Sequence, residues 1–320
     1  MMRIASIDIG TNTILLLIAD IDRQGKIHPV HHEQRYPRLG KDVDERKKIP
    51  RSAFDRAVEA LEEFNAIALH YHTERIIACA TSAARDAVNK DDLLRHLRST
   101  TGLTVEVLSG REEALWSYRG VMTGLETSTI PPVVVDIGGG STEIIYQDSE
   151  SSLSKSDTDT ESSLVRFSLQ LGSVRLTERF FMHDPPEEQE LQAAAGFIDR
   201  ELGRLPPFDF SRRILIGVAG TATTLACLDQ GLMEFDIGKV SGYSLSRTRI
   251  ADWFKQLSAR TIHEIRSLSR TTEGREDILT AGILILNEFM GRFGCETLIV
   301  SERGLRYGLV LREWQRSTGL

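Results

Sequence analysis

The sequence predicts an α/β protein of two domains that repeat one architecture. Its 320 residues exceed what one hydrophobic core usually organises, so we expect two domains. The stretch SIDIGTNT at 6–13 returns as VDIGGGST at 135–142, each between short apolar runs. Strand-like and helix-like segments then follow in the same order in both halves. This pattern indicates an internal duplication of a whole domain and not a short tandem repeat.

Composition places the chain among ordinary soluble globular proteins, with 41% hydrophobic and 27% charged residues. No apolar run reaches the roughly 18 residues that span a bilayer, and we expect AGILIL at 281–286 to be a core helix. The N-terminal MMRIASIDIG lacks the pattern of a secretory signal. We therefore expect a cytoplasmic protein without membrane contact, in which Cys79, Cys227 and Cys295 are reduced structural thiols.

The charge balance argues against a nucleic-acid partner. The net charge is −7 and the isoelectric point is about 5.7, whereas a long nucleic-acid surface needs a basic excess. Net charge does not describe individual sites, so a locally basic cleft in this acidic protein remains compatible with the sequence.

In the first half we expect the order strand, strand, strand, helix, strand, helix, strand, helix. RIASIDIG (3–10) and TILLLIADI (13–21) read as a hairpin, and 25–40 as a third strand and a loop that ends at Gly40. ERIIACATSAAR (74–85) reads as a strand and a helix start, and TVEVLSG (104–110) as a strand. An amphipathic helix after position 52 is predicted by apolar residues spaced three and four apart: Phe54, Val58, Leu61, Phe64 and Ile67.

The second half repeats this order after the two prolines at 131–132. VVVDIGGGSTEIIYQ (133–147) is strand, turn, strand, and the Ser/Asp-rich segment 147–163 reads as a flexible extension of that hairpin. LVRFSLQLG (164–172) and SVRLTERF (173–180) follow as strand and helix, and 213–226 and 296–310 each read as strand, turn, helix. We predict one domain at 1–125, joined by a C-terminal helix at about 303–320, and a second at 126–302.

Each repeated turn suits a phosphate group. Glycines let the backbone approach a ligand closely and turn several N–H groups toward it, and Asp8 and Asp136, which precede the turns, suit Mg²⁺ or a metal-bound water. For a single copy, a tight hairpin capped by its own aspartate explains the pattern equally well. Two copies in matching contexts favour phosphate. The expected phosphate-binding residues of the turns are Gly10, Thr11, Asn12 and Thr13 in the first, and Gly138, Gly139, Gly140, Ser141 and Thr142 in the second.

A third turn, GVAGTATTL at 217–225, places Gly220 and Thr221 at a helix N-terminus, where the helix dipole favours an anion. Close packing of helix on strand is the alternative explanation. No Walker A loop and no Rossmann fingerprint occurs in the sequence.

Seven motifs occur in a fixed order: DIGTNT, ATSAARDA, SGREEA, VVDIGGGSTE, LGSVRLTE, GVAGTATTLA and SERGLRYG. Over essentially the whole chain, this series resembles the exopolyphosphatase/guanosine pentaphosphate phosphohydrolase (Ppx/GppA) family of the actin-like superfamily. The resemblance implies two ribonuclease-H-like (actin-like ATPase) domains with the active site in the cleft between them. It also implies Mg²⁺-dependent hydrolysis of a terminal phosphoanhydride and a homodimer.

The resemblance assigns the carboxylates their roles. Glu112 and Glu113 open one helix about 100° apart, so only one of them can face a cleft. The family motif puts its catalytic base at Glu113, although a glutamate in a first helical turn also simply complements the dipole. Asp136 and Glu143 are implied as catalytic residues that bind a metal or water, with Asp8 as the symmetric partner from the other domain.

Five cationic residues are candidate phosphate ligands. Arg85 follows a strand end, where its guanidinium can bind phosphate in bidentate fashion, or instead pair with Asp86. The resemblance adds a phosphate-contacting loop at RLGKDVD, and two weaker arginines that surface packing also explains. These further candidates are Arg38, Lys41, Arg275 and Arg306.

Two departures from the family pattern qualify these assignments. Glu276 stands after Arg275 where a small residue is usual, which weakens Arg275 as a ligand. The sequence also stops at Leu320 without the C-terminal helical region and HD-type metal motif of long members, so we expect the short form, with less grip on very long chains.

Polyphosphate is the favoured substrate over guanosine pentaphosphate, because no separate element that would read guanine is visible. A kinase of the same superfamily, with GVAGTATTL serving an adenosine site, is a second hypothesis. A non-enzymatic actin-like sensor is a third.

Overall fold

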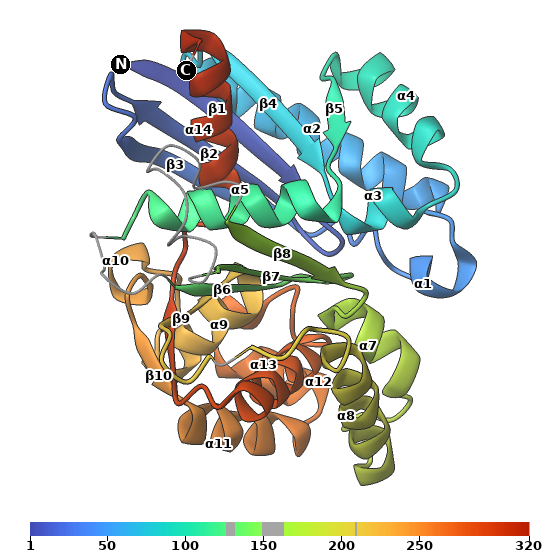
Figure 1. The fold of residues 1–320 in the computed structure, drawn as a ribbon. Coiled ribbons are helices and arrows are strands. Elements are labelled where there is room, and N and C mark those ends of the chain that lie inside the picture. The colour runs from blue at the N-terminus through green and yellow to red at the C-terminus, as the bar shows by residue number, and fades with distance from the viewer. Residues whose placement is uncertain (126–131, 149–162, 209, 320) are drawn as a thin grey trace. The chain divides into compact units, whose positions relative to one another are not determined.

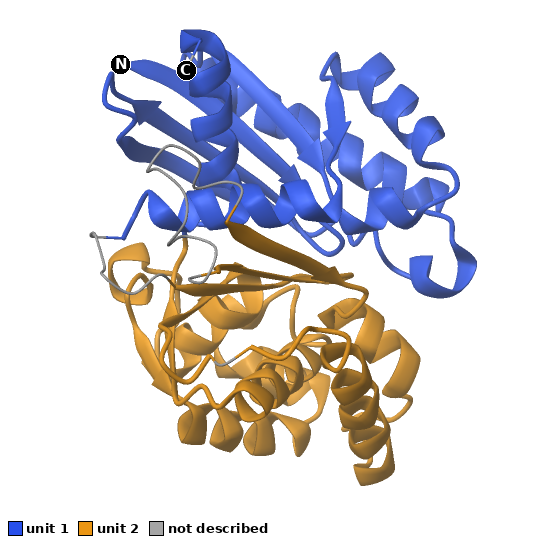
Figure 2. Ribbon diagram, in the orientation of Figure 1, with its two compact units in different colours: residues 1–125, 303–320 blue, residues 126–302 orange. Residues whose placement is uncertain are grey.

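The computed structural model describes residues 1–125, 132–148, 163–208 and 210–319 (Figure 1). The chain divides into two compact units, 1–125 with 303–320, and 126–302 (Figure 2). Each unit holds one mixed sheet covered by helices, which confirms the predicted α/β protein of two domains. Most of the Ser/Asp-rich segment, expected to extend a hairpin, lies outside the described residues.

The sheet of the first unit has the order β3-β2-β1-β4-β5. The hairpin and third strand are antiparallel, as predicted, whereas β4 and β5 run parallel to β1. The carboxyl ends of β1 and β4 therefore meet at one edge. The strands are β1 Met2–Ile9, β2 Ile14–Ile21, β3 Ile27–Arg35, β4 Arg75–Ala80 and β5 Val105–Val107.

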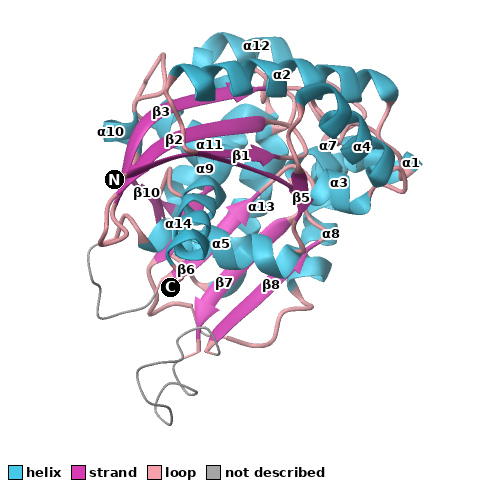
Figure 3. Ribbon diagram, turned by 90° about the horizontal axis from the view of Figure 1, so that it is seen from above, coloured by secondary structure: helices cyan, strands magenta, loops and turns pink. Residues whose placement is uncertain are grey.

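Helices cover both faces of this sheet. Phe54, Phe64 and Leu97 from α2 and α4 pack on one face, and Leu305 and Tyr307 from α14 on the other; Figure 3 shows α2 and α14 on opposite sides of β1 to β3. The single helix expected after β4 is two helices, α3 and α4, and α1 was not foreseen. The helices are α1 Val43–Arg46, α2 Arg51–His70, α3 Ser82–Asp86, α4 Lys90–Thr101, α5 Gly110–Met122 and α14 Leu305–Thr318.

The second sheet repeats the first. Its order is β10-β11-β9-β6-β7-β8, so reading from β8 gives three antiparallel strands followed by two parallel ones, with β10 added at the edge. The duplication predicted from the two Asp-Ile-Gly stretches is therefore present in the topology. The strands are β6 Val133–Ile137, β7 Thr142–Gln147, β8 Leu164–Leu169, β9 Leu215–Val218, β10 Ser244–Ser246 and β11 Thr297–Val300.

The core of the second unit lies around α13, which contains the AGILIL stretch and is buried as predicted. The three cysteines are buried thiols outside any disulfide, and burial raises the pKa of Cys79 to about 12 and of Cys227 to about 11. Within the described residues, no helix is long and apolar enough to cross a membrane. The helices of this unit are α7 Ser173–Phe180, α8 Glu188–Leu202, α9 Ala219–Asp229, α10 Ile237–Val240, α11 Arg247–Ser258, α12 Ile262–Leu268 and α13 Leu279–Phe293, with a 3₁₀ turn at Arg270–Thr272.

Candidate active site

The two glycine turns have the same hydrogen bond. Gly10 N donates to Thr13 O at 3.0 Å, and Gly138 N donates to Ser141 O at 3.0 Å. Each turn joins the first two strands of its sheet. The sequence repeat is therefore a repeat of backbone geometry, which supports one common use for both turns.

In the first unit a second loop packs on the turn. Gly40 N donates to Thr11 O at 2.7 Å, and Arg38 N donates to Asn12 O at 3.1 Å. Arg38 has a positive φ of 51°, a strained conformation for a residue with a side chain. The two predicted phosphate-binding segments, the glycine turn and the loop of Arg38 and Lys41, are thus in direct contact.

In the second unit the start of a helix, α7, packs on the glycine turn. Ser173 N donates to Gly138 O at 2.9 Å, and Val174 N to Gly139 O at 2.8 Å, so the N-terminus of α7 holds the turn. Both packing loops begin with Leu-Gly, at 39–40 and 171–172. Gly172 is needed because a methyl group there would overlap Gly139 O and lie 2.5 Å from Gly140 C.

At the start of α5 the two adjacent glutamates, Glu112 and Glu113, have different partners. Ser109 and Glu112 form a capping box: Glu112 N donates to Ser109 Oγ at 3.3 Å, and Ser109 N donates to Glu112 Oε2 at 2.8 Å. The hydrogen bonds from Ser109 lower the pKa of Glu112. Glu112 therefore caps the start of the helix.

Glu113 points elsewhere and meets Arg85. Its side chain is buried, and Arg85 Nη1 donates to Glu113 Oε2 at 2.9 Å and to Leu108 O at 3.0 Å. Two of the predicted site residues, 28 positions apart, thus form one ion pair. A buried carboxylate held by a guanidinium is a fixed and oriented acceptor.

Asp136 and Glu143 lie directly opposite each other on β6 and β7. Opposed residues of an antiparallel pair project to the same face, with their Cβ atoms about 5 Å apart. Glu143 is 1% exposed, and Ser168 Oγ on β8 donates to Glu143 Oε1 at 2.7 Å. The structure therefore brings the two predicted metal ligands together and adds Ser168, which the sequence did not single out.

We expect Ser168→Ala to lower activity about three- to tenfold. A hydrogen bond to a charged group contributes about 1.5–3 kcal/mol, and a water molecule that takes the place of the hydroxyl group recovers part of this energy. Ser168→Thr, which keeps the hydroxyl, is the matched control and restores most of the activity. The measurement is kcat with polyphosphate, the substrate that the family resemblance implies. An alanine variant as active as the parent would show that Ser168 does not position Glu143.

Asp8 occupies the position in the first unit that Asp136 occupies in the second. It is the last residue but one of β1, opposite Leu15 on β2 and Cys79 on β4. Thr81 N donates to Ile9 O at 3.1 Å, so the segment that leads to Arg85 lies beside the first glycine turn.

The third turn joins two further candidates. The guanidinium of Arg275 lies directly on Gly220, where a methyl group would overlap it. Ala219 has a positive φ of 64°, an alanine conformation that costs about 1–2 kcal/mol and often marks a functional site. Thr221, in contrast, packs its side chain against Gly282 of α13.

Arg306 contacts the strands of the first sheet. Its Nη1 donates to Leu16 O at 3.2 Å and lies 3.3 Å from His32 Nδ1. Burial and this positive charge lower the pKa of His32 to about 4. These contacts lie on β2 and β3, and a phosphate-binding role for Arg306 stays a prediction.

Arg175 is a functional candidate that sequence reasoning missed. Its buried side chain donates from Nε to Gly140 O at 2.9 Å and from Nη2 to Gln170 Oε1 at 2.9 Å. The guanidinium thus fixes a carbonyl of the glycine turn. The LGSVRLTE motif contains this residue, but its partner is 35 positions away, so only the fold reveals the contact.

The comparisons with known proteins identify the family of the chain. The model of the Ppx/GppA phosphatase family matches residues 17–317. Exopolyphosphatase 2 of Mycobacterium tuberculosis is 35% identical over 97% of this chain and 98% of its own.

Solved structures show the same fold. The Ppx/GppA family member of Aquifex aeolicus is 32% identical with a TM-score of 0.78, covering 99% of this chain and 98% of its own. An exopolyphosphatase from Cytophaga hutchinsonii is 28% identical with a TM-score of 0.84, covering 99% and 98%. With its two repeated glycine turns and its Glu113–Arg85 pair, the chain belongs to the Ppx/GppA phosphatase family and is a phosphoanhydride hydrolase.

Proposed function

We propose that this protein is an exopolyphosphatase that removes the terminal phosphate of inorganic polyphosphate and works as a homodimer. The observation that carries the proposal is the buried Glu113–Arg85 pair of the first unit. The glycine turn of this unit has the same backbone hydrogen bond as the glycine turn of the second unit. The similarity to exopolyphosphatase 2 of M. tuberculosis supports the choice of substrate.

Phosphate oxygens would be held by backbone N–H groups of the glycine turns and by cationic side chains. Arg38 and Lys41 belong to the loop on the first turn, and Arg275 to the third. Binding of this kind neutralises the charge that spreads over the transferred phosphoryl group and aligns it for in-line attack.

Glu113 would orient the attacking water and accept its proton. The water oxygen forms a bond to the terminal phosphorus while the bond to the bridging oxygen breaks, so inorganic phosphate leaves and the chain is one phosphate shorter. Arg85 Nη1 keeps Glu113 Oε2 in place. A base held this firmly loses little entropy when it aligns the water.

Mg²⁺ fits the Asp136 and Glu143 pair. Among residues 1–125, 132–148, 163–208 and 210–319, no group of three or more His, Cys, Asp or Glu side chains has metal-binding geometry. Mg²⁺ usually takes one or two protein carboxylates and completes its shell with water and substrate phosphates. When bound, it would neutralise charge on the phosphate chain.

The test is a side-by-side assay of long polyphosphate, tripolyphosphate and guanosine pentaphosphate, each with Mg²⁺ and with EDTA. We expect a higher kcat/KM for polyphosphate than for guanosine pentaphosphate, and faster hydrolysis in Mg²⁺ than in EDTA. A preference for guanosine pentaphosphate would reassign the substrate. Tight ADP binding with slow hydrolysis would favour a kinase. Light scattering checks the dimer, expected at twice 35.8 kDa.

A further inference from the structure

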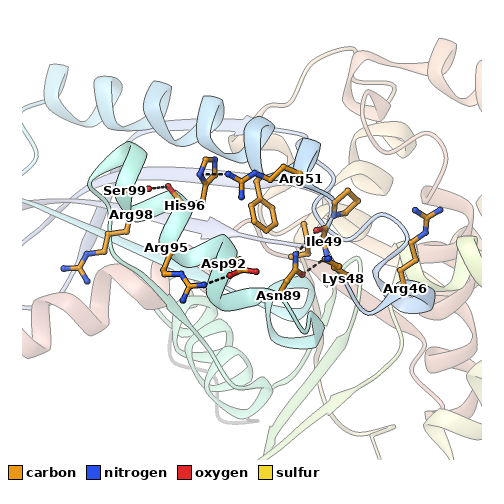
Figure 4. Close-up of a pocket in the computed structure, with 12 residues that line it drawn as sticks. Arg46, Lys48, Ile49, Arg51, Asn89, Asp92, Arg95, His96, Arg98 and Ser99 are labelled. Atoms are coloured by element: carbon orange, nitrogen blue, oxygen red, sulfur yellow. Dashed lines mark hydrogen bonds and ion pairs between the residues drawn. The ribbon is translucent and has the colours of Figure 1, made fainter.

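A basic pocket in the first unit is lined by none of the residues assigned above. Its volume is about 1160 Å³, at the upper end for a small-molecule site. It is formed by the end of α1, the loop into α2, the first turn of α2, and α4 (Figure 4). None of its lining residues belongs to the glycine turns, the loop of Arg38 and Lys41, or the Glu113–Arg85 pair.

The pocket wall is strongly cationic. One carboxylate, Asp92, lines it, against five cations: Arg46, Lys48, Arg51, Arg95 and Arg98. This local excess is opposite in sign to the net charge of −7 of the whole chain. Like charges gathered in one concave wall repel one another, and an anionic ligand removes that repulsion.

Three of the cations, Lys48, Arg51 and Arg98, are exposed and form no ion pair in the described part of the chain. Arg46 is paired with Asp42 at 3.8 Å, and Arg95 is paired with Asp92. Arg51 Nη2 lies 3.2 Å from His96 Nδ1. Donors that protein carboxylates do not neutralise are therefore available to a ligand.

The pocket is held in shape by backbone contacts. Asn89 donates from Nδ2 to Ile49 O at 2.9 Å and accepts from Ile49 N at 3.0 Å. Val88 N donates to Lys47 O at 2.8 Å. These bonds tie the loop before α2 to the connection before α4, so the two basic walls keep their spacing without a ligand.

The placement of the cations and the buried Phe54 indicate which ligand fits the pocket. Figure 4 shows Arg46 and Arg98 at opposite ends of the pocket with Lys48, Arg51 and Arg95 between them, so the cations are spread along the pocket and not gathered at one point. Phe54 lines the pocket but is only 2% exposed, so its ring offers no stacking surface to a nucleobase. The spread of the cations favours an extended anion.

We propose that this pocket binds an inorganic oligophosphate of three or more phosphates, at a site separate from the reacting one. The guanidinium groups suit phosphate oxygens in bidentate fashion. The proposal does not depend on the catalytic roles given above.

The test measures tripolyphosphate binding by titration calorimetry to the Glu113→Gln protein, which is expected not to consume the probe. We expect two sites per chain. Adding Lys48→Glu and Arg98→Glu should remove one site or weaken it at least tenfold. The matched control adds Arg23→Glu and Lys26→Glu, the same charge change on exposed residues of the β2–β3 turn, and keeps both sites.

The other possible results of the titration decide between the pocket, the glycine turns and a different ligand. Equal binding by the Lys48/Arg98 and Arg23/Lys26 variants overturns the pocket proposal. One site in the Glu113→Gln protein that disappears with Lys48 and Arg98 supports the pocket and contradicts phosphate binding at the glycine turns. Tighter pocket binding of guanosine triphosphate, or of a short polyglutamate peptide, than of tripolyphosphate overturns the choice of an inorganic ligand. Because Lys48, Arg98, Arg23 and Lys26 are exposed, both double substitutions should leave the melting temperature within a few degrees of that of the Glu113→Gln protein.

Discussion

We expect Glu113→Gln to lower the kcat for polyphosphate, the proposed substrate, about 10²- to 10⁴-fold, the usual contribution of a general base. The amide has nearly the shape of the carboxylate but cannot accept the proton of the attacking water. It also cannot form the ion pair with Arg85 Nη1, now at 2.9 Å. Phosphate release in single-turnover and steady-state assays measures the loss, and KM should change much less than kcat.

Glu112→Gln is the matched control for this prediction. It makes the same chemical change one residue away, in the side chain that caps α5 and not in the one that meets Arg85. Glutamine still serves a capping box, so we expect activity within about twofold of the parent and a stability loss below about 1 kcal/mol. If the two variants lost activity equally, the effect would belong to the helix start and the assignment of Glu113 as base would fail.

Gly172→Ala is expected to have the next largest effect. A methyl group would overlap Gly139 O, and it would lie 2.5 Å from Gly140 C, so the glycine turn or the start of α7 must move. Overpacking of this kind costs about 1–3 kcal/mol of stability. A displacement of about 1 Å at a catalytic site can cost 10²-fold in rate, so we expect kcat to fall more than about tenfold. Thermal unfolding and the polyphosphate assay together measure both effects.

Gly196→Ala makes the same substitution in α8 of the same unit. The nearest atom to the added methyl group is Arg200 Nη1 at 3.9 Å, so no clash results. Alanine in a helix interior is favoured over glycine by about 0.5–1 kcal/mol, and this variant should be as active as the parent and slightly more stable. An active, normally stable Gly172→Ala protein would show that the close approach to the turn is dispensable.

Much of the fold was predictable because its signals are local. The repeated Asp-Ile-Gly stretches fixed two hairpins, and the three- and four-residue spacing after position 52 gave α2. Short helices such as α1 and α10, of four residues each, carry no such periodicity and depend on tertiary contacts.

The site was predictable only where its residues form local motifs, such as the two glycine turns. Spacing could not decide between Glu112 and Glu113, because the deciding partners are Ser109 for one and Arg85 for the other. Arg175 and the basic pocket escaped notice because their contacts join segments about 35 to 50 positions apart. Contacts of that range follow from the sheet order and not from any local pattern.

Because the chain returns to the first unit after residue 302, the two units are completed in a fixed order during synthesis. Leu305 and Tyr307 of α14 complete one face of the sheet that begins at Met2, whereas residues 126–302 contain a whole sheet and its core. During translation the first unit therefore keeps one apolar face uncovered until α14 has been made, while the inserted unit already has all of its parts. Removal of α14 would expose the same apolar face of the finished protein again.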